Sequence, residues 1–338
     1  MKIIKEEENP VIHKMAGLFA KMDINQVLSD ELKVQKWQVD AAVKLIDEGN
    51  TIPFIARYRK EVTGALNDEV LRNLFERLTY LRGLEERKEA VLASIEEQGK
   101  LTDELKAKIV AAQTLVAVED LYRPYKPKRK TRASIAKAAF EKEKGLEPLA
   151  NIIYLQMTTK SLEEEAKAYV DEEKGVATVA EALAGAGDIL AEAISDEADY
   201  RTKIRGLTEK EGSVVSQAKD EEAQSVYEMY YQFSETVKKI AGHRVLALSR
   251  GEAEKSLTVK IEAPVDKILS YLEKEIIRRD NAHTNDFLKN VIKDSYDRLI
   301  APSIEREIRT ALTEKAEEGA ISVFGKNLKQ LLMQPPIT

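Results

Sequence analysis

A run of basic side chains without a single acid lies between Leu121 and Lys137, where the sequence reads LYRPYKPKRKTRASIAK. Lysines and arginines bind phosphate oxygens and tyrosines stack on bases, so this combination suits contact with nucleic acid. Pro124 and Pro127 exclude a regular helix, and we expect an extended loop. The candidate contact residues in this loop are Arg123, Lys126, Lys128, Arg129, Lys130 and Arg132.

Two roles for this loop remain open from the sequence. It contacts phosphate or a partner protein, or it packs on the protein and forms internal ion pairs. In the first case we expect Lys128, Arg129 and Lys130 to face the partner. Arg123 is the residue that we expect to pair internally.

A second basic cluster follows an apolar segment in TIPFIARYRKEVTGAL, residues 51–66. Its candidate binding residues are Arg57, Arg59 and Lys60, with Tyr58 among them. In a helix the apolar and the basic side chains would lie on different faces, so burial and charge could coexist. Pairing of Arg57 with acids of a neighbouring helix is the alternative.

The residue pattern predicts no catalytic, cofactor or metal site. The three histidines are far apart in the sequence, cysteine is absent, and neither a GxxxxGK[ST] loop nor an HExxH motif occurs. The segment GAG at 185–187 is only half of a dinucleotide fingerprint, and a plain turn is favoured. The consecutive Glu163, Glu164 and Glu165 would point in different directions on a helix. We expect a protein that is not an enzyme and has no small-molecule substrate.

Composition makes any site for a polyanion a local one. The 338 residues carry 53 basic and 59 acidic side chains, a net charge of -6. No run of about 20 apolar residues occurs, so we expect no contact with a membrane and a cytoplasmic protein.

The elements that must position these residues are predicted to be helices. Only 6% of residues are aromatic, and Asn67 to Gly99 carries leucines at spacings of three and four between an N-cap and a C-cap residue. Thr102 would cap a second helix, giving a long antiparallel hairpin over 67–118. Further helices are expected at 24–32, 36–48, 132–143, 146–156, 162–171, 178–194, 198–210, 220–231, 235–250 and after Pro264 and Pro302.

The expected fold class is all-α, an irregular multi-helix array with one short β element at 256–263. The expected organisation has an N-terminal extension (1–21), a helical region (22–200) that includes the hairpin, a helical connector with the strand (201–263) and a C-terminal helical segment (264–338). The Gly-rich AGAGD at 184–188 and EKEGS at 209–213 are candidate turns between regions.

Four strings in order, IPFIARYRKEVTGAL, VEDLYRPYKPKRKT, GLEPLA and HRVLALSRGEAEKSL, resemble the N-terminal half of the Tex family of bacterial transcription accessory proteins. The resemblance runs from about Met22 to the end of the chain. It implies a helical region with a helix-turn-helix-like element and long helices. It also implies that a ribonuclease-H-like domain, a helix-hairpin-helix region and an OB-fold RNA-binding domain would follow, and that this chain lacks them.

The resemblance supplies no catalytic residue and places nucleic-acid binding chiefly in the domains that would follow. The leading hypothesis is therefore a scaffold that positions RNA- or DNA-binding domains and contacts RNA polymerase or elongation factors. The alternative is a protein interaction module with no nucleic-acid contact of its own.

Overall fold

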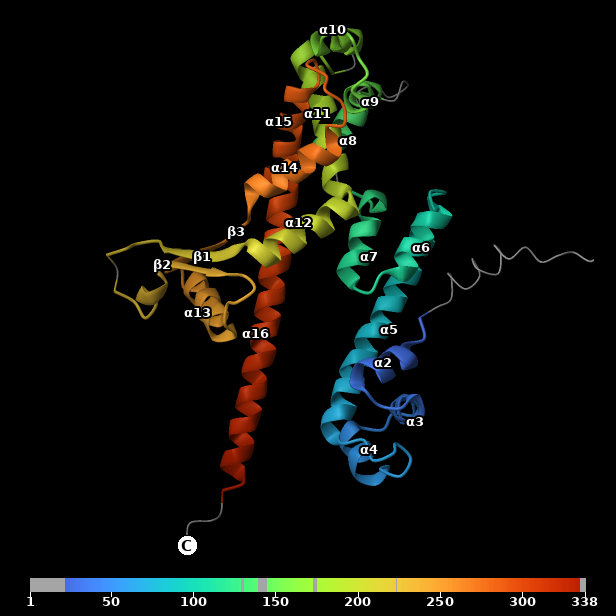
Figure 1. Ribbon diagram of the computed structural model, residues 1–338, viewed down its shortest axis with the longest axis vertical. Helices are drawn as coiled ribbons and strands as arrows, with labels where there is room; N and C mark the ends of the chain where they lie inside the picture. Colours follow the sequence, from blue (N-terminus) through green and yellow to red (C-terminus); the bar gives the residue numbers. More distant parts are fainter. Residues whose placement is uncertain (1–21, 129–130, 139–144, 173–174, 223, 335–338) are drawn as a thin grey trace, which may run out of the picture. The chain divides into compact units, whose positions relative to one another are not determined.

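The computed structural model describes residues 22–128, 131–138, 145–172, 175–222, 224–334 and shows two compact units, 1–126 and 127–338. We call these unit 1 and unit 2. Helices dominate both, which confirms the predicted fold class (Figure 1). The division by packing falls at Lys126, whereas the expected organisation has boundaries after residues 200 and 263.

Unit 1 is organised around one long helix. Its described elements are α2 (Ile24–Leu32), α3 (Lys36–Asp47), α4 (Ile52–Tyr58), α5 (Asp68–Glu97), α6 (Asp103–Ala111), α7 (Leu115–Tyr122) and the 3-10 turn η1 (Arg123–Tyr125). The Asn67 side chain caps α5 by accepting from the Val70 amide at 2.8 Å, and Gly99 follows the helix with a φ of 65°. Both caps were predicted. The predicted apolar stripe is buried: Leu71, Leu74, Leu78, Leu81, Leu84, Val91 and Ile95.

The second arm of the hairpin is two helices, α6 and α7, so the prediction of a single second helix in the hairpin over 67–118 is wrong. The Thr114 side chain accepts from the Ala117 amide at 3.2 Å and is the N-cap of a new helix, α7. At the end of α6, the buried Lys88 ammonium donates to the Val110 carbonyl at 2.8 Å. Lys88 also pairs with Glu85 at 2.8 Å, so its charge is compensated inside the unit.

Two arginines of α5 fasten the shorter helices to it. Arg77 binds both carboxylate oxygens of Glu31 in α2, and Arg82 does the same to Asp47 at the end of α3. Hydrogen bonds from these guanidinium groups lower the pKa of Glu31 and of Asp47. The C-terminal ends of α2 and α3 are thereby held against the middle of α5.

The turn after α4 is clamped by the first residues of α3. Gln38 donates from Nε2 to the carbonyls of Thr63 and Gly64, at 3.3 Å and 2.9 Å. Gly64 and Ala65 both have positive φ, 62° and 61°, a conformation that favours glycine. A Cβ on Gly64 would lie 2.4 Å from the Trp37 ring, so this ring needs a glycine beneath it.

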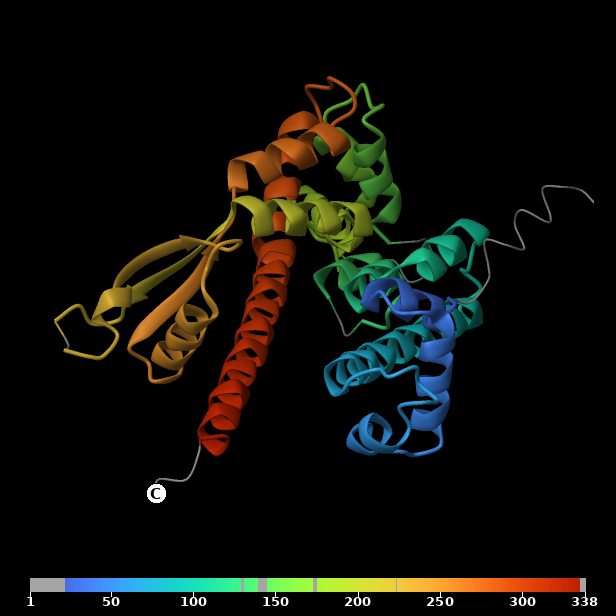
Figure 2. The ribbon, with the colours of Figure 1, turned by 60° about the horizontal axis from the view of Figure 1, so that its bottom comes forward.

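In unit 2 a small sheet lies to one side of the helices, with α13 and α16 next to it (Figure 2). Its described elements are α8 (Arg132–Ala138), α9 (Glu147–Leu155), α10 (Leu162–Ala166), η2 (Lys167–Tyr169), α11 (Val179–Asp196), α12 (Ala198–Glu211), β1 (Ser213–Ala218), η4 (Glu228–Tyr230), β2 (Gln232–Thr236), α13 (Gly242–Ala253), β3 (Leu257–Glu262), α14 (Val265–Ile276), α15 (Asn285–Asp294), the π-helical turn η5 (Ser295–Ile300) and α16 (Ala301–Leu332). The sheet order is β2-β1-β3 with antiparallel pairs, so β1 is central.

Three sequence-based expectations for unit 2 are corrected. The strand at 256–263 is confirmed as β3, but β1 and β2 were not predicted. Among the described residues of 220–231 the only helical segment is the short 3-10 turn η4, and the helix expected from 235 begins at Gly242. The Gly-rich segment 184–188 lies inside α11 rather than in a turn. A Cβ on Gly185 would lie 2.4 Å from the Leu146 side chain, so this glycine permits close packing of α11.

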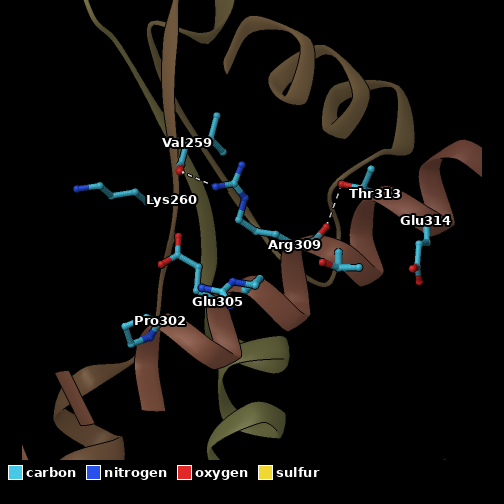
Figure 3. A pocket seen from close by; sticks show the side chains of 9 residues that line it. Val259, Lys260, Pro302, Glu305, Arg309, Thr313 and Glu314 are labelled. Carbon is cyan, nitrogen blue, oxygen red and sulfur yellow. Dashed lines mark hydrogen bonds between the residues drawn. The ribbon is translucent and has the colours of Figure 1, made fainter. Parts of the chain in front are cut away.

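The outer edge of β3 is covered by two side chains of α16 (Figure 3). The Ile261 amide donates to Glu305 Oε1 at 3.0 Å, and Arg309 donates to the Val259 carbonyl at 3.2 Å. Residues four apart on a helix are separated by about 6 Å along its axis, close to the two-residue repeat of a strand. Because Arg309 is also paired with Glu252, its position over the strand is fixed.

An arginine with no exposed surface joins α12 to α16. Arg201 donates to Glu307 at 2.7 Å and to Ser303 at 3.0 Å, and Arg205 also pairs with Glu307, at 2.8 Å. Burial alone would raise the pKa of Glu307, but the hydrogen bonds and charges of Arg205 and Arg201, with the Ser303 hydroxyl, outweigh it and lower the pKa.

Substitution Glu307→Gln should destabilise unit 2. It removes the carboxylate that faces a fully buried guanidinium, which costs about 3 kcal/mol of unfolding free energy. Because the pKa of Glu307 is lowered on folding, its contribution is present above its usual value near 4.5 and is lost as the pH falls further. Urea unfolding followed by circular dichroism measures both effects. Glu314→Gln, on the exposed side of α16, is the matched control, and equal stability of the two variants at pH 7 would contradict the assignment.

Substitution Gly64→Ala should destabilise the clamped turn of unit 1. A positive φ costs an alanine about 1–2 kcal/mol, and the new Cβ must also displace the ring of Trp37. Trp37 is the single tryptophan, so its fluorescence emission reports the displacement directly during urea unfolding. Gly83→Ala is the control, because a Cβ there meets nothing within 4 Å and α5 should gain stability. Unchanged emission and stability in Gly64→Ala would refute the clamp.

Candidate functional site

The first predicted cluster lies exposed at the end of α4. For Arg57 and Lys60, no ion pair or hydrogen bond of the side chain occurs within the described part of the chain. Arg59 donates to the Tyr58 carbonyl at 3.2 Å, and its guanidinium lies 5.2 Å from the centre of the Phe54 ring. The predicted separation of faces is observed, because Ile55 of the same helix is fully buried.

Exposed aromatic side chains accompany these cations. Tyr58 is 56% exposed and Trp37 is 54% exposed. Trp37 belongs to the same surface because its ring covers Gly64, in the turn that follows the basic residues. We call this set the basic–aromatic surface and define it by Trp37, Arg57, Tyr58, Arg59 and Lys60. Flat aromatic faces beside cations provide the contacts that single-stranded nucleic acid uses.

Sequence reasoning did not single out Trp37. Position 37 is the second residue of a predicted helix, and its apolar type favours burial in the core. The packing of its ring on a glycine about 27 residues away, which fixes it at the surface, has no local sequence signal.

The second predicted cluster is divided between the two units. In unit 1, Arg123 begins η1 and is partly buried, and Lys126 lies 3.5 Å from Glu119. In unit 2, Lys128 pairs with Asp196 and with Glu192. This pairing of Lys128 favours an ion-pairing role for that residue. Arg132 is the exposed first residue of α8, and Arg129 and Lys130 lie outside the described residues.

Within unit 1 the two predicted clusters lie at opposite ends of α5 (Figure 1). The basic–aromatic surface precedes Asn67, whereas η1 is tied to the other end, where Gln98 donates to the Tyr125 carbonyl at 2.9 Å. The 30 residues of α5 span roughly 45 Å at 1.5 Å per residue. Arg123 and Lys126 therefore do not form one contact patch with the basic–aromatic surface.

The described residues provide no arrangement for catalysis by a bound metal. No group of three or more metal-ligating side chains occurs among them. A cavity of about 660 Å³ between β3 and α16 has Glu305 and Arg309 in its wall, and both are engaged in covering the strand (Figure 3). Among the helices described, none has the length and apolar character to cross a membrane.

Comparison with known families matches two regions of the chain. Residues 22–96 match the Tex-like protein N-terminal domain, and residues 158–324 match the Tex central region-like family. The first region contains the basic–aromatic surface, and the second contains most of unit 2.

Curated relatives extend the match over nearly the whole chain. A Bacillus subtilis protein, "Uncharacterized protein YdcI", is 47% identical over 317 residues, which are 93% of this chain and 43% of that protein. The "Transcriptional accessory protein Tex" of Neisseria gonorrhoeae is 40% identical, covering 93% of this chain and 42% of the relative. The human "S1 RNA-binding domain-containing protein 1" is 30% identical, covering 93% and 32%.

The chain thus spans less than half the length of these relatives. Both family models, and relatives that align with more than nine tenths of this chain, describe one family. The chain belongs to the Tex family of transcription accessory proteins, corresponding to the N-terminal half of its longer members.

Proposed function

We propose that this chain is the scaffold half of a transcription accessory protein, positioning nucleic-acid-binding domains and offering surfaces to the transcription machinery. The observation that carries the proposal is the C-terminal half of α16. From Glu317 onward every described residue of this helix is exposed, although the first half is part of the core of unit 2.

The exposed half of α16 has an apolar stripe. Ile321, Phe324, Leu328 and Leu331 recur at spacings of three and four, with exposed fractions of 71%, 67%, 42% and 63%. An apolar stripe of this length in water is a docking surface in most soluble proteins. Relatives more than twice as long supply an occupant: the region that lies beyond the part matched by this chain.

The basic–aromatic surface supports a nucleic-acid contact within the same scaffold. Its cations Arg57 and Lys60 have no acidic partner in the described residues, which leaves their charge available to phosphate.

A protein interaction module without nucleic-acid contact is the second candidate function. It is favoured by the internal pairing of Lys128, which removes one predicted phosphate contact.

The stripe should bind the missing part of a longer family member. We expect this chain to co-elute in size-exclusion chromatography with the separately produced C-terminal region of the Bacillus subtilis relative. Phe324→Asp with Leu328→Asp should abolish co-elution, because a charge cannot be buried in an apolar interface without a partner. Val323→Asp, equally exposed on another face of α16, is the control. Co-elution of the double variant would refute docking through the stripe.

The basic–aromatic surface should make a salt-dependent contact with nucleic acid. Arg57→Ala with Lys60→Ala should weaken binding of labelled single-stranded RNA or DNA, measured by fluorescence anisotropy between 50 and 200 mM salt. Loss of two phosphate contacts should lower the slope of log K against log salt by about 1.4 for a single strand. Lys44→Ala with Lys100→Ala removes the same charge elsewhere in unit 1. An equal effect of both pairs, or no binding at all, would favour the interaction module.

A further inference from the structure

A loop of unit 2 is held in place by one buried glutamine. Gln156 is 5% exposed and has a φ of 54° at the end of α9. Its Oε1 accepts from the amides of Arg278 and Arg279, at 3.1 Å and 3.0 Å. Its Nε2 donates to the Ile276 carbonyl at 2.8 Å, so a single side chain satisfies the end of α14 and the start of the next loop.

The far end of the same loop is held by Asn281. Its Nδ2 donates to the carbonyls of Gln156 and Thr158, at 3.1 Å and 2.9 Å, and its Oδ1 accepts from the His283 amide at 2.9 Å. Segments 120 residues apart in the sequence thus form one rigid structure. The loop between α14 and α15 lies beside α9 and α10 in Figure 1.

Large apolar side chains remain exposed where these segments meet. Tyr154 is 42% exposed, Leu155 57% and Met157 63%. They flank Gln156 in sequence, so the buried glutamine fixes the backbone on which they stand. Three exposed apolar side chains within four residues exceed the scattered single ones of an ordinary surface.

Cations without acidic partners accompany the apolar residues. About half of the arginines of the described chain are paired with carboxylates, among them Arg77, Arg82, Arg87, Arg201, Arg205, Arg298 and Arg309. Arg278, Arg279 and Lys160 are exposed and form no ion pair within that part of the chain. Arg278 is nonetheless oriented, because its Nε donates to the Glu275 carbonyl at 3.0 Å. The neighbouring Asp280 accepts from the Asn285 amide group at 3.0 Å.

Tyr154 and Arg278 both influence the pKa of a third residue, Tyr200. Burial, together with the proximity of Tyr154 and Glu197, raises the pKa of Tyr200 to about 12, and Arg278 acts in the opposite direction. Tyr154 and Arg278, which belong to different segments, are therefore close enough to influence the same phenol. Gln156, which lies between Leu155 and Met157, accepts from the Arg278 and Arg279 amides, so the apolar and the cationic side chains stand on joined backbone. We call this surface the α9–α14 tip and define it by Tyr154, Leu155, Met157, Arg278 and Arg279.

We propose that the α9–α14 tip binds an extended or helical segment of a partner protein that carries apolar side chains flanked by aspartate and glutamate. Charge complementarity selects the acids, since both arginines lack a carboxylate of their own. Tyrosine, methionine and arginine are the residue types enriched in protein interfaces, and tyrosine and arginine are enriched among the residues that dominate binding energy.

A protein partner fits this surface better than a nucleic acid does. Leu155 and Met157 offer no planar face for a base, and the acid Asp280 lies among the cations. The backbone clamp also suits protein docking, because a loop that is ordered before binding loses little conformational entropy on binding. This inference does not depend on the basic–aromatic surface or on the stripe of α16.

Selection from a random peptide library displayed on phage tests the proposal. The full chain is the bait, and the variant Tyr154→Ala, Arg278→Ala, Arg279→Ala serves for counter-selection. We expect enriched peptides that combine acids with leucine, phenylalanine or methionine. Enrichment of basic or purely polar peptides, or no enrichment over the counter-selected pool, would overturn the proposal.

Affinity measurements on one enriched peptide supply the controls. Fluorescence anisotropy should show about tenfold weaker binding for Arg278→Ala with Arg279→Ala. Arg250→Ala with Arg306→Ala, which removes two exposed arginines elsewhere in unit 2, should leave binding unchanged. Gln156→Ala keeps every cation but breaks the clamp, so weakened binding with an unchanged circular dichroism spectrum would support pre-organisation. Competition for the tip by a 12-nucleotide oligouridine, lost in the arginine double variant, would assign the tip to nucleic acid and overturn the proposal.

Discussion

Burial of one face of a long helix is the constraint on which both units depend. The apolar stripe along the 30-residue helix α5 would be unfavourable in contact with water. Helices α2, α3, α4 and α7 pack on α5 and bury this stripe. Ion pairs then fix which short helix lies where, as with Arg77 on Glu31 and Arg82 on Asp47. In unit 2, α16 meets the same requirement only over its first half, through α12, α13 and the edge of β3. The chain packs α4 on α5 and must then turn back to Asn67, where α5 begins. The basic–aromatic surface lies at this turn, so its position follows from the packing of α4 on α5.

The helices were largely predictable because their signals are local. Asn67 and Gly99 mark the ends of α5 by side-chain and backbone chemistry that needs no tertiary partner. The two missed strands have no such signal: β2 is a five-residue segment, QFSET, with one apolar side chain, and it is a strand only because β1 lies beside it. The glycines of AGAGD favour a turn because glycine disfavours helices, but close packing of Gly185 against Leu146 outweighs that preference.

For the candidate surfaces, the sequence predicts the type of charge but not whether that charge is paired. Sequence shows where cations cluster, but not whether a carboxylate lies opposite them. Lys128 and Asp196 are 68 residues apart, and their pairing follows from the packing of α11. Arg57 and Lys60 have the same residue types as the paired cations and differ only in lacking such a neighbour within the described chain. Arg278 and Arg279 were not singled out, because a pair of arginines before an aspartate is unremarkable until Gln156 is seen to hold their backbone.

The π-helical turn η5 has a mechanical consequence. A proline at position 302 would break an α-helix by removing a donor, but the looser turn over Ser295–Ile300 lets α15 continue into α16, and Ser295 anchors it to the Ala191 carbonyl at 2.7 Å. Elements of 10, 6 and 32 residues thereby become one rod about 70 Å long. The clamped loop stands at one end of this rod and the apolar stripe at the other. Under the scaffold function proposed above, partners bound at the two ends would be held at a fixed spacing along unit 2.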